Sequence, residues 1–472
     1  MELKDQNVFN SYDDVAIKCP YCFNTFFHNE VGFRVEPISD EKVKEYTRKI
    51  SSVDEKEAEK YKKKFENAKH YVKKRDSIWH EYWEKMGYIG SATLYENGDG
   101  YDEYNDHSRP SALSDLQDPI IGLDNDMLIG EKCVDADGFV VAAVDNRGEI
   151  TERRICPHCH NKLPKDYGKN PVKFIAVVGI SGSGKTVMLS QLIENIEDYA
   201  TNAGGKVTFD SSDSASKFPL QYKVKANQEL PSGTREHFAP PIYLQFTKTE
   251  KKSWKETTLV IYDIAGESCI NAGGIEKYGP FVRNSDGIIL LLDPRQISAF
   301  SCADENAEKP TAVLNAMGKA FLLDDNQVCK VPFAVAYSKS DKLQNAGIDI
   351  NENSHIFRPI EYTAQRGFML DSYKNVRFEV ESLLKKYSPT FYHNVVDFFE
   401  NYGFFAFSSL GHDAESTSSS DGKKANVLTM NLEPKRLEEP LLWLLYKWKL
   451  IDGVTQAKQE PKLKLPSWLG RK

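Results

Sequence analysis

The chain has 472 residues, enough for roughly two to four structural units of the usual domain size. Its 61 Lys and Arg and its 69 Asp and Glu give a net charge of −8, which argues against a protein that coats nucleic acid without specificity. Hydrophobic residues make up 40% of the chain, which excludes global disorder, and the lack of a long apolar run or a signal segment leads us to expect a cytoplasmic protein.

Four of the eight cysteines form two pairs of the same C-P-x-C form, separated by 133 residues. Each pair presents two thiolates on a tight turn, and two such turns supply the soft ligands of a closed tetrahedral Zn²⁺ site. A redox pair is the alternative function of a C-x-x-C motif. We expect a structural site, because four thiolates leave no position open for substrate. The predicted zinc ligands are Cys19, Cys22, Cys156 and Cys159, with His28, His158 and His160 as substitutes.

The long gap between the cysteine pairs predicts an insertion into a zinc ribbon. Residues 40–87 are predicted to form a long charged helix or hairpin, in which Ser52 and Glu55 have the spacing of a capping box and Gly87 is the expected stop. Residues 91–137 hold twelve acidic residues and predict an acidic loop. Residues 139–144 and 149–154 flank a turn at 145–148 and predict a β-hairpin that leads into the second cysteine pair.

Beyond residue 172 the chain alternates apolar strands with helical segments. This alternation predicts an α/β fold with a mostly parallel sheet flanked by helices. The last helix is expected at residues 439–450, followed by a polar tail. The expected strands are 174–178, 242–246, 259–262, 287–292, 333–337 and 404–407.

The sequence GISGSGKT at residues 179–186 fits the pattern G-x-x-x-x-G-K-[ST] between an apolar strand and an amphipathic helix. In such a phosphate-binding loop (P-loop), glycines let backbone N–H groups close on phosphates, and the helix N-terminus adds a positive dipole. We expect Lys185 to reach the β- and γ-phosphates and Thr186 to place its hydroxyl on Mg²⁺. The loop residues expected to bind nucleotide are Gly179, Ser181, Gly182, Ser183 and Gly184.

The apolar strand at residues 259–262 is followed by Asp263, at the position of a carboxylate that holds Mg²⁺. Gly266 follows and completes a D-x-x-G motif. With this motif the chain resembles the Ras-like, translation-factor class of P-loop GTPases. The resemblance implies that Gly266 senses the γ-phosphate and begins the second switch segment.

Two later motifs are similar to the guanine-recognition boxes of the same class. SKSD at residues 338–341 resembles [NT]-K-x-D, and SSL at residues 408–410 resembles S-A-[KL]. The resemblance implies that the Asp341 carboxylate accepts from two guanine N–H groups, that Lys339 lies over the base, and that Ser338 ties the box to the P-loop. The backbone of the second box would read guanine O6, and its residues are Ser408, Ser409 and Leu410.

The same resemblance requires a Thr that binds Mg²⁺ and the γ-phosphate, and a residue that orients the attacking water. Thr234 is the first candidate for the Thr, and Thr208 is the second. Glu267 stands where Ras-like enzymes carry Gln. It either orients water or repels the γ-phosphate, and we favour slow intrinsic hydrolysis. The nearest candidates for an arginine finger are Arg235, Arg283 and Arg295.

The ordered motifs together resemble a narrower group, the zinc-ribbon double-GTPase proteins of bacterial conflict operons. Those proteins are GTPase subunits thought to act with partner proteins in antiviral defence. The chain is therefore predicted to be a GTP-binding, slowly GTP-hydrolysing switch or assembly factor that uses GTP/GDP, Mg²⁺ and Zn²⁺ and has protein partners. The alternatives are a zinc-ribbon scaffold with a degenerate nucleotide site and a P-loop ATPase.

These motifs divide the chain into five predicted segments. The zinc ribbon is split into halves at 1–35 and 139–168, around an inserted helical arm and acidic loop at 36–138. The P-loop GTPase domain is expected at 169–452 and a polar tail at 453–472.

Overall fold

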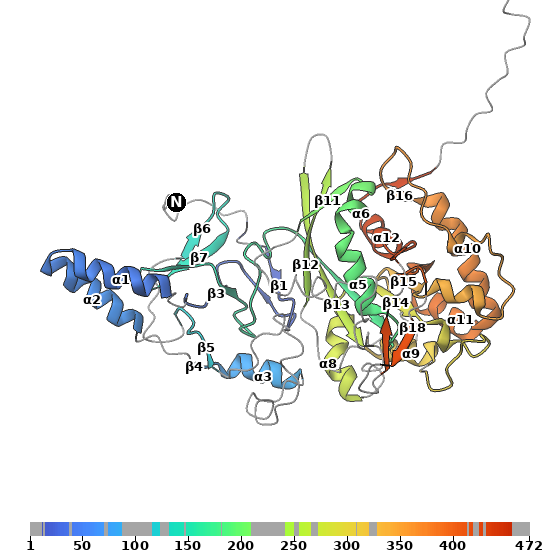
Figure 1. Ribbon diagram of the computed structural model, residues 1–472, viewed down its shortest axis with the longest axis horizontal. Helices are drawn as coiled ribbons and strands as arrows, with labels where there is room; N and C mark the ends of the chain where they lie inside the picture. The colour runs from blue at the N-terminus through green and yellow to red at the C-terminus, as the bar shows by residue number, and fades with distance from the viewer. Residues whose placement is uncertain are drawn as a thin grey trace, which may run out of the picture.

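The structure is a computed structural model. It describes residues 12, 15–36, 40–69, 74–86, 116–122, 132–145, 148–180, 182–208, 241–249, 254–265, 272–307, 309–320, 328–412, 415–418, 424–427 and 431–455. Figure 1 shows an N-terminal module lying beside a larger α/β domain. Within the described part of the chain, no helix combines the length and the apolar character needed to cross a bilayer.

A seven-stranded sheet forms the centre of the α/β domain, with its strands in the order β11-β12-β13-β10-β14-β15-β17. Five strands are mutually parallel, whereas β12 is antiparallel to both of its neighbours. The mostly parallel sheet expected from the sequence is thereby confirmed. The strands are β10 (Val172–Gly179), β11 (Gly205–Thr208), β12 (Ile242–Thr249), β13 (Trp254–Ala265), β14 (Gly287–Leu292), β15 (Phe333–Tyr337) and β17 (Tyr402–Ala406).

The central strands are apolar along their length because the sheet is covered on both faces. In β10, Ile175 and Val177 pack into one hydrophobic cluster, while Phe174 and Val178 pack into the other. One face is covered by α5 (Lys185–Glu194), α6 (Ile196–Asn202) and α12 (Glu439–Lys447). The other face is covered by α8 (Ala272–Arg283), α9 (Pro310–Ala320), α10 (Leu370–Tyr387) and α11 (Pro389–Phe398).

The parallel strands end at one edge of the sheet, and the described residues of the predicted nucleotide motifs lie at that edge. Gly179 at the end of β10 pairs with Leu291 of β14, and Tyr337 at the end of β15 pairs with Ala406 of β17. Ligands of open α/β sheets bind outside the carboxyl ends of the strands. The smaller elements in this domain are η3 (Pro294–Gln296), η4 (Ser340–Asn345), η5 (His355–Phe357), β16 (Phe368–Met369), β18 (Glu415–Ser418), β19 (Lys424–Val427) and β20 (Gly453–Val454).

Short strands build the N-terminal module and hold the two cysteine pairs together. β3 pairs with β9, and the predicted hairpin is present because β7 pairs with β8. Side chains of α3, such as Trp83, share a hydrophobic cluster with Cys156 and Phe139. The elements are β1 (Ile17–Lys18), β2 (Thr25–Phe26), β3 (Gly32–Phe33), β4 (Lys74–Arg75), α3 (Ser77–Lys85), β5 (Leu116–Gln117), β6 (Lys132–Val134), β7 (Val140–Val144), β8 (Ile150–Thr151) and β9 (Arg154–Ile155).

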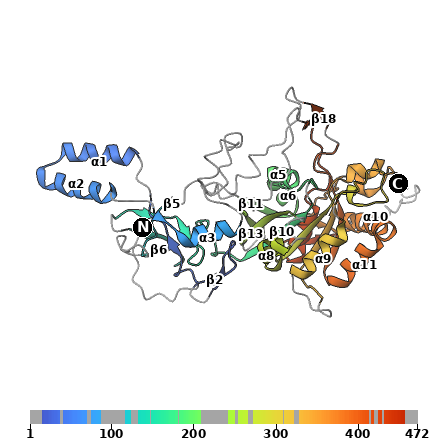
Figure 2. The same cartoon turned by 90° about the horizontal axis from the view of Figure 1, so that it is seen from below.

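The charged segment at residues 40–87 forms three helices, of which α1 (Asp40–Ser52) and α2 (Glu55–Lys69) precede α3. The expected capping box is wrong, because Asp54 caps α2 by accepting from the Glu57 backbone N–H at 2.9 Å. The Ser52 hydroxyl donates to a carbonyl of its own helix. In Figures 1 and 2, α1 and α2 project from the N-terminal module away from the α/β domain. The expected stop at Gly87 lies outside the described residues.

The N-terminal module contacts the sheet through the first cysteine turn. Phe23 lies directly after Cys22, and its ring makes edge contacts with Phe174, Tyr262 and Phe281, at centroid distances of 5.0 to 6.1 Å. The Tyr262 hydroxyl donates to the Pro20 carbonyl at 2.7 Å, a buried hydrogen bond. The first cysteine turn therefore packs against β10, β13 and α8.

We expect Phe23→Ala to weaken this junction. The substitution removes an aromatic ring from three aromatic partners, so the free energy of unfolding should fall by about 2 kcal/mol. Phe27→Ala is the matched control, because Phe27 lies in the same module and its side chain is 39% exposed. Chemical denaturation of both variants checks the prediction, and equal losses in the two would contradict it.

Candidate functional site

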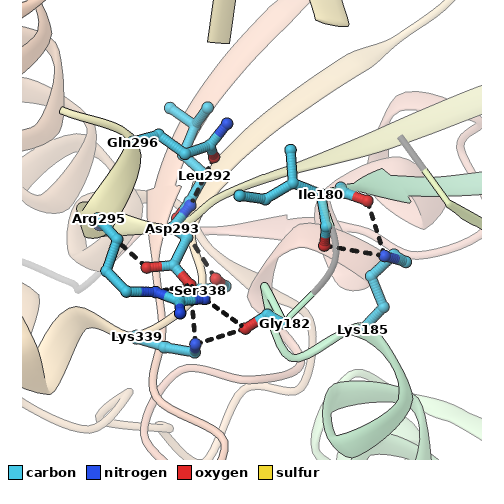
Figure 3. A network of polar contacts seen from close by, with 10 residues as sticks. Ile180, Gly182, Lys185, Leu292, Asp293, Arg295, Gln296, Ser338 and Lys339 are labelled. Atoms are coloured by element: carbon cyan, nitrogen blue, oxygen red, sulfur yellow. Dashed lines mark hydrogen bonds and ion pairs between the residues drawn. The ribbon is translucent and has the colours of Figure 1, made fainter. Parts of the chain in front are cut away.

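The P-loop connects β10 to α5 through two glycines with left-handed backbone conformations. Gly182 has φ 71° and Gly184 has φ 88°, values that L-residues rarely adopt. The buried Lys185 Nζ donates to the carbonyl oxygens of Gly179 at 2.7 Å and Ile180 at 3.1 Å (Figure 3). These bonds hold the ammonium group at the N-terminus of α5, where the helix dipole also favours an anion.

The two predicted Mg²⁺ ligands in the described residues face each other. Asp263 lies near the end of β13, paired in register with Val177 of the neighbouring β10. Its Oδ2 accepts from the Thr186 hydroxyl at 3.4 Å, and the Asp263 side chain is buried. Hydroxyl and carboxylate oxygens are the ligands that Mg²⁺ prefers. This pair of side chains could therefore hold the cation beside the P-loop.

The two guanine-type boxes lie side by side. Asp341 Oδ1 accepts from the Ser408 hydroxyl at 2.5 Å, across 67 residues of sequence. The Ser340 backbone N–H donates to the Phe407 carbonyl at 3.0 Å, which aligns the two loops. The second box is supported in turn by residues 431–435, since the backbones of Ser408 and Lys435 exchange two hydrogen bonds. Ser409 is buried in the same loop.

The resemblance predicts that Ser338 ties the first guanine-type box to the P-loop. In the structure Lys339 makes this contact. Lys339 Nζ donates to the Gly182 carbonyl at 2.5 Å. The Ser338 hydroxyl donates to the Leu292 carbonyl at the end of β14, at 3.3 Å. Ser338 therefore anchors the box to a neighbouring strand, and the lysine bridges the box to the P-loop.

Sequence reasoning missed Asp293, which follows β14. Its carboxylate is fully buried and accepts from Lys339 Nζ at 2.7 Å and from Arg295 Nη2 at 2.7 Å. Burial by itself raises the pKa of Asp293, but hydrogen bonds from Arg295 and the charge of Lys339 outweigh it and leave this pKa below its ordinary value. The sequence does contain a signal for Asp293, because the apolar stretch GIILLL at residues 287–292 is directly followed by Asp, as the strand at residues 259–262 is.

Several predicted residues lie outside the described parts of the chain, namely Ser181, Thr234, Arg235, Gly266 and Glu267. The alternative Thr208 is exposed at the end of β11, the edge strand of the sheet. Three strand spacings separate β11 from β10, about 14 Å at the usual distance between strands. This position argues against Thr208 as a Mg²⁺ ligand. Arg283 ends α8 and is exposed.

The four predicted zinc ligands come together in the N-terminal module. The Sγ atoms of Cys19, Cys22, Cys156 and Cys159 all lie within 4.8 Å of one another. The nearest pairs span the two turns, with Sγ–Sγ distances of 3.7 Å for Cys19–Cys159 and 3.8 Å for Cys22–Cys156. No disulfide joins these four cysteines. Four thiols in one small cluster fit the closed tetrahedral coordination of Zn²⁺.

Neighbouring groups orient the thiols toward a common centre. The Tyr21 N–H points to Cys19 Sγ, and the His158 N–H points to Cys156 Sγ, both at 3.4 Å. The Asn161 side-chain amide donates to Cys159 Sγ at 3.3 Å and is itself fixed by the Trp83 indole N–H at 2.7 Å. Outer contacts of this kind fix metal ligands in place. Helix α3 of the insertion thus supports the cysteine cluster directly.

The three histidines named as substitute zinc ligands make polar contacts with other groups. His160 Nδ1 lies 2.9 Å from the Asp76 carboxylate, and His28 Nδ1 accepts from the Val140 N–H. His158 Nε2 lies 3.1 Å from the Thr25 carbonyl oxygen. Burial raises the pKa of Asp76, but the contact with His160 and the bonds from Trp79 and Arg34 outweigh it and lower this pKa to about 2.

Parts of the chain are similar to known proteins. A crystal structure of a tyrosine-to-alanine variant of Era from Aquifex aeolicus, bound to GDP and AlF4⁻, matches with 14% identity and a TM-score of 0.23, over 61% of this chain and 60% of that chain. The chain thus spans less than two thirds of that structure. No curated protein matches the chain. The model of the family Double-GTPase 2 matches residues 173–385, so this segment is similar to P-loop GTPase domains of the double-GTPase type.

Proposed function

We propose that the protein binds GTP and GDP and hydrolyses GTP slowly, as a Mg²⁺-dependent switch or assembly factor. The observation that supports guanine nucleotides most directly is the pairing of Asp341 with Ser408 beside the P-loop. A carboxylate held at this position accepts from the two N–H groups on the Watson–Crick edge of guanine. Adenine does not offer both donors in that arrangement.

Different residues in and near the P-loop would bind different parts of the triphosphate and its Mg²⁺. The backbone of the loop from Gly179 to Lys185 would surround the β-phosphate, and the Lys185 ammonium would neutralise charge on the β- and γ-phosphates. Thr186 and Asp263 would hold Mg²⁺, with Thr234 as a third ligand from the first switch segment. Mg²⁺ in this place would supply positive charge where the γ-phosphoryl group departs.

Slow intrinsic turnover follows from the residue that stands where a glutamine orients water in Ras-like enzymes. A carboxylate at Glu267 beside an anionic γ-phosphate is repelled by it, a cost that Gln avoids. We propose a rate well below the roughly 10 s⁻¹ of a median enzyme, raised when a protein partner supplies a better-placed group.

The N-terminal module is proposed to be a structural zinc ribbon that carries the partner surface. The resemblance to conflict-operon GTPases suggests a bacterial defence system as the setting, with a partner encoded nearby. The α1–α2 hairpin projects away from the nucleotide site and could contact such a partner (Figure 2).

The test of guanine recognition is Asp341→Asn. An amide presents an N–H donor where the carboxylate presents only acceptors, so preference should move from GTP toward xanthosine triphosphate. The expected change in the ratio of the two affinities is at least about a hundredfold, because one favourable contact is lost and another is gained. Equilibrium titrations with GTP, xanthosine triphosphate and ATP, with and without Mg²⁺, measure it.

Asp349→Asn is the control for this test, because it makes the same change of charge on an exposed residue of the same loop. Equal affinity of the wild-type protein for ATP and GTP would favour a P-loop ATPase. Binding of neither nucleotide would favour a scaffold with a degenerate site.

A further inference from the structure

Asp293 joins the end of β14 to the first guanine-type box. Its carboxylate begins the short helix η3, accepting from the Arg295 backbone N–H at 3.0 Å, while Gln296 Oε1 accepts from the Asp293 N–H. The same carboxylate accepts from the Arg295 side chain and from Lys339. Its side chain has no exposed surface, so these hydrogen-bond donors replace water in stabilising the charged carboxylate.

The two cations held by Asp293 share a second acceptor. Lys339 Nζ and Arg295 Nη2 both donate to the Gly182 carbonyl, at 2.5 Å and 3.0 Å (Figure 3). We call the three side chains of Asp293, Arg295 and Lys339 the clamp. One carboxylate against two cations leaves the clamp with a net positive charge beside the P-loop, and Arg295 and Lys339 remain 34% and 26% exposed. The exposed Asp304 adds a weaker attraction on Arg295.

The clamp contacts the middle of the P-loop, on the other side of Gly182 from Lys185. Lys185 donates to Gly179 and Ile180, where β10 ends, whereas the clamp donates to Gly182. Figure 3 shows Gly182 between the two groups of cations. Since Lys339 belongs to the guanine-type box, Arg295 stands on the base side of the loop, away from the place where Lys185 would meet the γ-phosphate. That position argues against Arg295 as an arginine finger.

Two observations explain why residue 182 is a glycine. The first is its φ of 71°, a left-handed backbone conformation that L-residues rarely adopt. In addition, a Cβ built on Gly182 would lie 3.0 Å from Arg295 Nη2, the atom that donates to the Gly182 carbonyl. A side chain at residue 182 would therefore require the Arg295 guanidinium to move by a few tenths of an ångström.

We propose that Asp293 is a positioning residue that holds Arg295 and Lys339 against the P-loop, and that Arg295 adds to the binding of the nucleotide on its ribose and base side. The proposal rests on the proposed function, because it assigns a further binding group to the same guanine-nucleotide site. Both GDP and GTP carry the ribose and the base, so the clamp serves them equally. It acts on affinity, and the γ-phosphate is not involved.

The experiment measures GDP and GTP dissociation constants and single-turnover GTP hydrolysis for Arg295→Ala, Arg295→Lys and Asp293→Asn. We expect Arg295→Ala to weaken the binding of both nucleotides by the same factor, about tenfold, and to leave the rate at saturating GTP nearly unchanged. Arg295→Lys should recover part of the affinity. Asp293→Asn should cost about a hundredfold, because both cations are released. The double variant Asp293→Asn/Arg295→Ala should be no worse than Asp293→Asn alone.

Arg366→Ala is the matched control, an exposed arginine of the same domain that lies just before β16. The proposal is overturned if the Arg295 variants bind both nucleotides as the wild-type protein does. It is also overturned if GTP hydrolysis at saturation collapses while GDP affinity stays constant, which would make Arg295 an arginine finger. Failure of the proposed function is a separate result, namely no binding of guanine nucleotides by the wild-type protein. Because Asp293 is buried, its variant is interpreted only together with Arg295→Ala, whose side chain is partly exposed.

Discussion

Lys185→Ala is expected to lower the affinity for GTP and GDP by about a thousandfold. The Lys185 ammonium is held at the N-terminus of α5 by the Gly179 and Ile180 carbonyls, beside the backbone N–H groups that would bind the phosphates. Loss of two charge-assisted hydrogen bonds to phosphate, each worth about 2 kcal/mol, accounts for this factor. Titration of a fluorescent GDP analogue measures the loss.

The design of this test separates binding from folding. Lys185→Met keeps most of the apolar stem of the buried side chain and should lose as much affinity as Lys185→Ala. Lys173→Ala is the control, since Lys173 stands at the other end of β10 and forms a partly exposed ion pair with Asp286. If Lys185→Met binds GDP within tenfold of the wild-type protein, the P-loop is not the nucleotide site.

The strands of the α/β domain could be predicted because burial on both faces makes each one a run of apolar residues. The stretch GIILLL is the clearest case, and β14 has the bounds that the sequence predicted, Gly287–Leu292. The edge strand β11 could not be found in the same way. It has four residues, alternates buried and exposed side chains and begins with Gly205, so its apolar signal is too short to stand out.

In the helical arm, the periodicity of apolar residues does not predict where one helix ends and the next begins. The predicted capping box places the start of a helix at Ser52, but Ser52 is the last residue of α1 and α2 begins at Glu55. One residue, Asp54, sets the break by capping α2. The packing of Trp79 and Trp83 on the cysteine turns also has no local signal, because it depends on contacts with residues nearly eighty positions away in the sequence.

The candidate nucleotide site also has parts that the sequence predicts and parts that it does not. The P-loop is one contiguous motif whose chemistry follows from its own residues, and the Thr186–Asp263 pair follows from adding the neighbouring strand. The clamp is different, because Asp293 and Lys339 meet only once β14 and β15 are known to be neighbours. The partner of Ser338 depends on the same strand pairing.

We expect one Zn²⁺ per chain, and its loss in the double variant Cys19→Ser/Cys156→Ser. Each substitution removes a ligand from a different turn, and both side chains are fully buried. Elemental analysis of the purified protein measures zinc, and Cys133→Ala is the control, because Cys133 lies in the same module outside the four-thiol cluster. Zinc retained by the double variant, or missing from the wild-type protein, would contradict the assignment.

The loss of zinc should unfold the N-terminal module. The module has only short strands around the cysteines, and the binding energy of a structural Zn²⁺, about 10–16 kcal/mol, is as large as the stability of a typical domain. The effect should also reach the α/β domain, because Phe23 and the Pro20 carbonyl lose their contacts with Phe281 and Tyr262 when the first turn unfolds. Tyr262 directly precedes Asp263, so we expect weaker Mg²⁺-dependent GTP binding in the double variant, while Mg²⁺-independent binding through Lys185 falls less. A zinc-free protein with unchanged unfolding and unchanged Mg²⁺ dependence would show that the cysteine cluster supports neither the module nor its contact with β13.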